Sequence, residues 1–236
     1  HFEMSEQNAR MITVQLAAAI AHLHKNHSMA HRDIKPENVL CRRRHNPMLV
    51  GSLKLADFGF CAKFSGGPKE PCFSLYAGSV DYFAPELAQI VRAVRKRQSQ
   101  QGMKYGAGVD CYALGCVVFE MFNGSTPHYF PDENKQIEKI IKGGLAYPKD
   151  SFGMVSSTGM DFMKRLLEPN QLKRMTIEEA MRHKWLQSVH DNALSVQMDE
   201  PADGAARKSK SPDELLRAKR RSERAQSKKG GPTFVV

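Results

Sequence analysis

Four side chains in the first quarter of the chain have types and spacings suited to acid–base chemistry and cation binding. Asp33 and Lys35 lie in the stretch His31-Arg32-Asp33-Ile34-Lys35-Pro36-Glu37-Asn38, and Asp57-Phe58-Gly59 begins nineteen residues after Asn38. A carboxylate beside an ammonium group can handle a proton and balance negative charge. The Asn38 amide and the Asp57 carboxylate offer the oxygen ligands that Mg²⁺ takes in proteins. Any one of these residues alone more often caps a turn, so only the types and spacing of all four together indicate chemistry.

These two stretches and Ala84-Pro85-Glu86 follow the order and gaps of three protein-kinase motifs. The motifs are the catalytic loop, the metal-binding turn and the end of the activation segment. The sequence therefore resembles the eukaryotic Ser/Thr protein kinases, most closely the calcium/calmodulin-dependent group, over roughly residues 1–187. The resemblance implies a mainly α fold: a kinase-like C-terminal lobe, in which a helical bundle surrounds a buried central helix and short hairpins carry the catalytic loop.

The resemblance also implies a role for each of the four side chains. Asp33 would accept or orient the proton of the substrate hydroxyl, and Lys35 would neutralise charge on the transferred phosphoryl group. Asn38 and Asp57 would hold Mg²⁺, and Lys35, Asn38 and Asp57 would together contact ATP. A lysine at position 35 points to serine and threonine as phosphoacceptors. The implied reaction is transfer of the ATP γ-phosphate to proteins, in a signalling role.

Six further residues match structural positions of the family: His31, Arg32, Phe58, Glu86, Asp110 and Arg174. His31 and Phe58 would stack in a hydrophobic spine and perform no chemistry. Glu86 and Arg174 would form a buried ion pair that fixes the activation segment. Asp110 begins a stretch similar to D-x-W-x-x-G, with Tyr112 in place of the usual tryptophan.

Arg32 resembles the arginine that pairs with a phosphorylated activation loop. Its partner would lie three residues before Gly78, where this chain has Leu75; Ser74 is adjacent, and the loop has no threonine. We therefore do not expect control by phosphorylation of this loop, as in kinases that use an inhibitory tail.

Five residues are candidates for substrate contacts. Glu37 and Glu120 coincide with acidic positions that basophilic kinases use to hold substrate arginines, through bidentate charge-assisted pairs. A glutamate follows the Pro36 position in many kinases, so a solvated or capping role stays open. Tyr76, Val80 and Phe83 would line an apolar pocket for the residue after the phosphoacceptor.

Hydrophobic periodicity predicts the elements that carry these residues. Residues 5–26 form an amphipathic helix with Ser5 as N-cap, and residues 39–41 and 53–56 form a hairpin. Residues 109–122 form a helix that is apolar nearly all round and therefore buried. We expect other helices at 87–97, 133–142, 158–168 and 176–187, and we interpret the polar stretch within 92–108 as a surface insertion.

The net charge of +10 is concentrated towards the C-terminus, where residues 201–236 hold ten Lys/Arg against four Asp/Glu. We expect residues 188–236 to be a basic tail without fixed structure, able to contact calmodulin or an anionic surface. No motif predicts binding to a specific nucleic acid. No run of 18 apolar residues predicts a membrane span. Five cysteines without a C-x-x-C pair favour an intracellular protein, cytoplasmic or nuclear.

No G-x-G-x-x-G occurs in the chain, and only thirty residues precede His31. We therefore expect a C-terminal lobe without the N-terminal lobe that carries the phosphate loop and strand lysine. This leaves a second hypothesis open: a catalytically inactive, kinase-like binding or scaffold protein.

Overall fold

The computed structural model describes residues 4–42 and 51–187, all within the compact unit His1–Gln197. The predicted tail, 188–236, and most of the basic turn after Cys41 lie outside the described residues. Helix α1, Glu6–His27, confirms the first predicted helix. The Ser5 side chain accepts a hydrogen bond from the Asn8 amide at 3.2 Å, so it caps one of the free N–H groups of the first turn.

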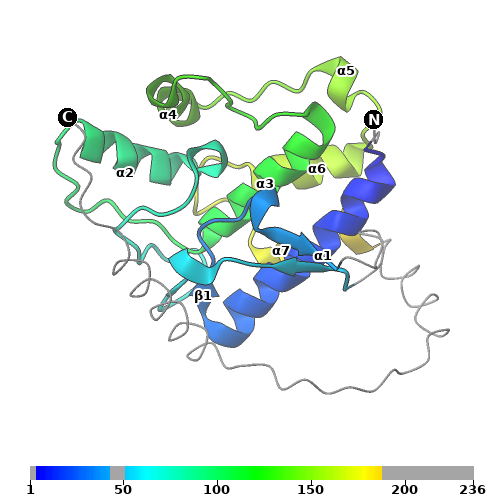
Figure 1. The fold of residues 1–236 in the computed structure, drawn as a ribbon, viewed down its shortest axis with the longest axis horizontal. Coiled ribbons are helices and arrows are strands. Elements are labelled where there is room, and N and C mark those ends of the chain that lie inside the picture. The colour runs from blue at the N-terminus through cyan, green and yellow to red at the C-terminus, as the bar shows by residue number, and fades with distance from the viewer. Residues whose placement is uncertain (1–3, 43–50, 188–236) are drawn as a thin grey trace, which may run out of the picture. The chain divides into compact units, whose positions relative to one another are not determined.

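Helix α3, Gly108–Asn123, is the centre of the core (Figure 1). Every residue from Val109 to Phe119 is buried, which confirms the predicted central helix. Helix α6, Ser157–Leu166, packs so closely on it that a Cβ at Gly115 would lie 2.9 Å from Cγ of Leu167, the C-cap residue of α6. Helix α1 also packs against α3, so the N-terminal helix and the central helix enclose one core.

Five shorter α-helices complete the bundle: α2 Pro85–Arg95, α4 Glu133–Lys142, α5 Lys149–Phe152, α6 Ser157–Leu166 and α7 Ile177–Met181. The prediction of one helix over 176–187 was wrong, because a turn at Arg182 and His183 follows α7. The His183 ring binds the Asp161 carboxylate at 2.9 Å and accepts the Trp185 amide at 3.2 Å, which stabilises the break.

Two small antiparallel pairs frame the catalytic loop. β2, Val39–Cys41, pairs with β3, Leu53–Leu55, and Val39 lies opposite Leu55, so the predicted hairpin is confirmed. β1, Met29–Ala30, pairs with β4, Ala62–Lys63, which periodicity did not predict because each strand has only two residues. Three 3₁₀ turns lie at η1 Pro36–Asn38, η2 Phe58–Phe60 and η3 Val80–Tyr82.

The prediction of a surface insertion within 92–108 is confirmed for residues 95–104, which are exposed except for the intermediate Met103, but not for the two ends of the segment. Helix α2 continues to Arg95, and Tyr105 is fully buried. The backbones of Phe73 and Tyr105 exchange two hydrogen bonds of 2.9 Å, so the segment ends by pairing with the activation segment. Tyr105, a single aromatic residue within a polar stretch, makes this contact. One apolar residue gives no periodic pattern, so the contact could not be predicted from periodicity.

In the described part of the chain, no helix combines the length and the apolar character needed to cross a membrane.

Candidate active site

Asp33 is held at the centre of a small hydrogen-bond network. Its side chain is only 4% exposed. One carboxylate oxygen accepts the Ser79 hydroxyl at 2.9 Å, and the other accepts the Asn38 amide at 3.0 Å and lies 3.1 Å from Lys35 Nζ. Lys35 Nζ also donates to the Ser79 hydroxyl at 2.7 Å. Asp33, Lys35 and Ser79 thus form a closed triangle with a fixed carboxylate and a fixed ammonium group.

Gly78 brings Ser79 to this triangle. It has a φ of +104°, which L-residues rarely adopt, and a Cβ there would lie 2.4 Å from the Arg32 carbonyl oxygen. Only glycine lets the activation segment pass this close to the catalytic loop.

The β2–β3 hairpin sets Asn38 and Asp57 at the same end of two paired strands. The Ala56 amide donates to the Asn38 carbonyl at 2.8 Å, next to the Val39–Leu55 pair. The side-chain nitrogen of Asn38 donates to both the carbonyl and the carboxylate of Asp33, which directs its amide oxygen towards other ligands. Asp57 is exposed and has a left-handed φ of 55°, with its carboxylate accepting the Gly59 amide at 3.2 Å.

These two oxygen donors suit a hard divalent cation that completes its shell with water and phosphate, as Mg²⁺ does. Among the described residues, no cluster of three or more His, Cys, Asp or Glu side chains is arranged to hold a metal. The donor set therefore fits a cation that arrives with a phosphate ligand better than a closed structural site.

Asp110 fixes the backbone before Asp33. Its fully buried carboxylate accepts the amides of His31 and Arg32 at 2.7 Å each and the His24 ring at 2.8 Å. Burial alone would raise the pKa of Asp110, but the hydrogen bonds and charge from His24 and the two amides hold this pKa below its ordinary value. The hydrogen bonds that the two amides donate to Asp110 also hold Arg32 at a φ of +67°, a left-handed conformation that needs such support.

The predicted contact of His31 with Phe58 is present, with ring centroids 5.4 Å apart. His31 is fully buried and its ring binds the Ala56 carbonyl at 3.0 Å. Phe58 is 47% exposed, so the described residues enclose only part of its ring, and its role in a hydrophobic spine stays a prediction.

Arg32 is held by neutral groups. Its guanidinium donates to the carbonyls of Phe60 at 2.7 Å and Leu75 at 3.4 Å and to the Tyr105 hydroxyl at 3.0 Å, and it lies 5.0 Å from the Phe73 ring centroid. Tyr105 in turn donates to the Leu75 carbonyl at 2.7 Å. Tyr105 thus connects Arg32 to the activation segment through a contact that requires no phosphate. Burial raises the pKa of Tyr105, so its hydroxyl remains a donor.

The ion pair predicted between Glu86 and Arg174 is present and bidentate, with N–O distances of 2.6 and 2.9 Å. The Arg174 side chain is 1% exposed and also donates to the carbonyls of Gly108, Glu168 and Pro169. Burial alone would lower the pKa of Arg174, but Glu86 outweighs it and raises this pKa. The pair anchors the start of α2 to the loop before α7.

One carboxylate contacts the Tyr82 hydroxyl, and two others act on it electrostatically. Tyr82 donates to Glu120 at 2.8 Å. Burial raises the pKa of Tyr82 most, and Glu120, Glu37 and Asp81 raise it further. The two glutamates predicted to contact substrate therefore both act on the Tyr82 hydroxyl. Asp81 adds a third negative charge, which sequence reasoning missed.

The three residues predicted to line one apolar pocket differ in burial. Phe83 belongs to the core and lines a narrow space of about 10 Å³ with Asp33 and Ser79. Tyr76 is 48% exposed, and Val80 packs partly buried against the core. Phe83 therefore packs in the core next to Asp33. The sequence prediction did not anticipate this position.

Residues 1–186 match the family model of the protein kinase domain. This chain belongs to the protein kinase family. The kinase sequence is 32% identical over 191 residues to a probable myosin light chain kinase of Dictyostelium discoideum, covering 81% of this chain and 35% of that protein. It is 30% identical over 207 residues to MAP kinase-activated protein kinase 5 of Homo sapiens, covering 82% and 42% respectively.

The kinase is also similar to the serine/threonine-protein kinase cds1 of Schizosaccharomyces pombe, with 32% identity over 188 residues, 79% of this chain and 37% of that protein. It spans less than half the length of each of these three relatives.

Sequence reasoning missed Ser79 and Tyr105 in this kinase site. Ser79 had one usable signal, because it follows a glycine in the segment that ends at Glu86. Tyr105 had none, since its contacts with Arg32 and Leu75 cross long stretches of chain.

Proposed function

We propose that this protein is a Ser/Thr protein kinase of the calcium/calmodulin-dependent type, which transfers the ATP γ-phosphate to serine or threonine hydroxyls. The observation that carries the proposal is the triangle of Asp33, Lys35 and Ser79 beside the oxygen donors of Asn38 and Asp57. Phosphoryl transfer depends mainly on positioning and charge neutralisation, and this arrangement provides both. The similarity to the serine/threonine-protein kinase cds1 supports serine and threonine as phosphoacceptors.

Asp33 would orient the substrate hydroxyl and accept its proton, because its carboxylate is buried and held by Asn38 and Ser79. Lys35 would place its positive charge beside the oxygens of the transferring group. Its ammonium group is held by two acceptors and so needs little reorganisation when charge develops.

ATP would arrive with Mg²⁺, and the Asn38 amide oxygen and the Asp57 carboxylate are the residues that would hold the cation. When bound, Mg²⁺ neutralises charge on the phosphate oxygens. Asn38 would serve both tasks, since its amide nitrogen holds the Asp33 carboxylate and its amide oxygen would bind the cation.

The kinase would be basophilic, that is, it would select substrates with arginine near the phosphoacceptor. Glu37, Asp81 and Glu120 gather negative charge around Tyr82, and Glu120 is fixed by its hydrogen bond from that tyrosine. A substrate arginine would gain charge-assisted contacts of about 1.5–3 kcal/mol each, enough for roughly tenfold selection or more.

Phosphorylation of a peptide library by the protein at its natural length, alongside the Glu120→Gln variant, tests this specificity. We expect arginine to be selected two or three residues before the phosphoacceptor, and selected less strongly by Glu120→Gln. Indifference to arginine in both enzymes would refute the basophilic assignment.

The decisive experiment on activity is Asp33→Asn, assayed by phosphate transfer from labelled ATP to a basic peptide. The amide cannot accept the proton, so we expect turnover to fall by about 100-fold to 10,000-fold with an unchanged circular dichroism spectrum. Asp150→Asn, at an exposed carboxylate on α5, is the matched control. More than about a tenth of the wild-type rate in Asp33→Asn would refute the role of Asp33. Transfer by neither wild type nor variant would favour the scaffold hypothesis.

A further inference from the structure

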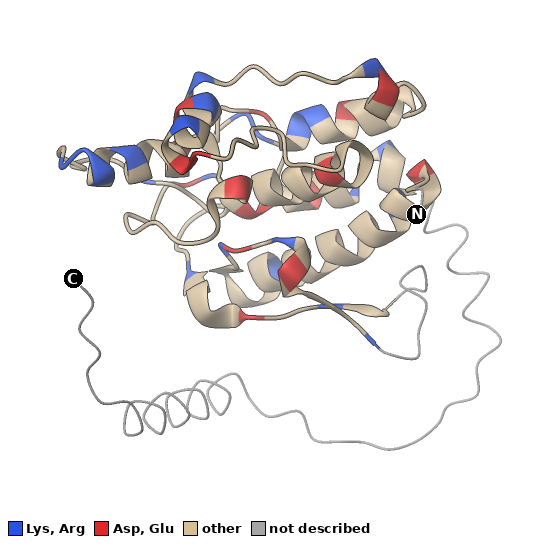
Figure 2. Cartoon of the chain, turned by 45° about the horizontal axis from the view of Figure 1, so that its top comes forward, with Lys and Arg blue, Asp and Glu red and all other residues tan. Residues whose placement is uncertain are grey.

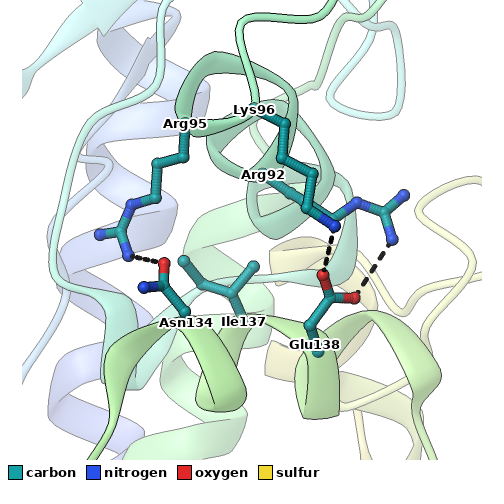
Figure 3. A pocket seen from close by; sticks show the side chains of 6 residues that line it. All are labelled: Arg92, Arg95, Lys96, Asn134, Ile137 and Glu138. Carbon is teal, nitrogen blue, oxygen red and sulfur yellow. Dashed lines mark hydrogen bonds and ion pairs between the residues drawn. The ribbon is translucent and has the colours of Figure 1, made fainter.

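A groove between α2 and α4 lies outside the catalytic centre (Figure 3). Its volume is about 590 Å³, within the range of ligand sites. The residues that line it are Arg92, Arg95, Lys96, Asn134, Ile137 and Glu138. In Figure 3, Arg95 and Asn134 form one side, Arg92, Lys96 and Glu138 form the other, and the apolar Ile137 lies between them.

The cations of this groove are only partly neutralised. Arg92 and Lys96 share Glu138 at 3.3 and 3.0 Å, and Arg95 binds Asn134 at 2.8 Å and the Glu133 carboxylate. These cationic side chains are 35–55% exposed. Blue ribbon segments, which mark Lys and Arg, accordingly gather at the end of α2 (Figure 2).

Arg97 adds a fourth cation just beyond α2, and within the described ranges its side chain has no carboxylate partner. The negative end of the α2 dipole stabilises cations in the last turn and explains part of this pattern. It does not explain a hollow between basic walls.

We propose that the α2–α4 groove docks an acidic peptide segment of a protein partner, one that presents spaced Asp or Glu side chains. Carboxylates would bind the exposed guanidinium and ammonium groups. The resident ion pairs are solvent-screened and contribute little, so a peptide carboxylate can share or replace them at little cost.

Charge and shape favour a peptide over other anions. Glu133 and Glu138 interrupt the basic walls and would repel the continuous phosphate line of a nucleic acid. The large exposed apolar side chains of the described residues, such as Phe58 and Leu75, do not line the groove, so it offers no anchor for a lipid surface. A peptide with spaced carboxylates matches both the cations and the gaps between them.

Fluorescence anisotropy with a fluorescein-labelled peptide, Glu-Glu-Leu-Glu-Glu-Leu-Glu-Glu, and the full chain tests the proposal. We expect saturable binding that weakens with salt, and at least tenfold weaker binding of the same peptide with glutamine in place of glutamate. The double variant Arg95→Gln/Lys96→Gln should bind the acidic peptide at least tenfold more weakly. The matched control, Arg220→Gln/Arg221→Gln, removes the same charge from the basic tail and should bind within about twofold of wild type.

Thermal unfolding of both double variants checks that α2 and α4 remain packed; if Arg95→Gln/Lys96→Gln is unfolded, the single variant Lys96→Gln takes its place. Equal loss of binding in the tail control, or none in the groove variant, would overturn the proposal. Tighter groove-dependent binding of single-stranded DNA or phosphatidylserine vesicles would assign the groove to those ligands instead. Binding does not require phosphoryl transfer, so failure here leaves the proposed kinase activity intact, and the reverse also holds.

Discussion

Removal of Arg174 should expose how much the fold depends on one buried ion pair. Arg174→Met leaves the Glu86 carboxylate, which is only 10% exposed, without its partner. An uncompensated buried charge costs about 3–5 kcal/mol. The carbonyls of Gly108, Glu168 and Pro169 also lose a donor, at about 1 kcal/mol each. We therefore expect a loss of roughly 6–8 kcal/mol, comparable to the total stability of many domains.

The double variant Glu86→Leu/Arg174→Met separates these contributions. It removes both charges but still leaves the three carbonyls without their donor, so it should be more stable than Arg174→Met by about 3 kcal/mol. Urea denaturation followed by fluorescence of Trp185, the single tryptophan and 1% exposed, measures this difference. Lys173→Met, at the exposed neighbour, is the control and should change the free energy of unfolding by less than about 0.5 kcal/mol. Additive effects of the two substitutions would refute the argument from uncompensated charge.

Two further predictions concern buried polar groups. Tyr105→Phe deprives the Leu75 carbonyl and the Arg32 guanidinium of a partner, so we expect a loss of about 1–3 kcal/mol and faster hydrogen exchange in residues 72–76; unchanged exchange there would show that the contact does not hold the segment. Burial and Lys139 lower the pKa of His128 from 6.5 to about 4, so its contribution to stability is complete above pH 6.5 and is lost as the pH falls towards 4. At about 1.4 kcal/mol per pKa unit, wild type should lose about 3 kcal/mol more than His128→Gln between pH 7 and 4 in parallel urea titrations, whereas identical pH profiles would contradict this.

Local patterns predicted the elements that depend on neighbouring residues. Helix α1 and the buried α3 follow from periodicity, and the β2–β3 hairpin follows from two short apolar runs. The pair of Glu86 and Arg174 was predictable only through the family resemblance, since 88 residues separate the partners.

Contacts made by single residues across the chain were not predictable from local patterns. Ser79 reaches Asp33 because Gly78 permits a close approach of two backbones, and Tyr105 reaches Arg32 across 73 residues. The exposure of Phe58 likewise depends on which elements cover it, and its position next to Asp57 does not specify that.

The bonds of Asp110 have a consequence for synthesis on the ribosome. The predicted catalytic loop is complete once Asn38 has emerged from the ribosome. The carboxylate of Asp110, which accepts the His31 and Arg32 amides, lies 79 residues after His31 and 78 residues after Arg32. Until α3 forms, Arg32 lacks the Asp110 contact that supports its left-handed conformation. A nascent chain therefore contains the side chains of the predicted site before they are arranged. The geometry of the predicted catalytic loop therefore forms only together with the hydrophobic core, so the proposed activity would require that core to be folded.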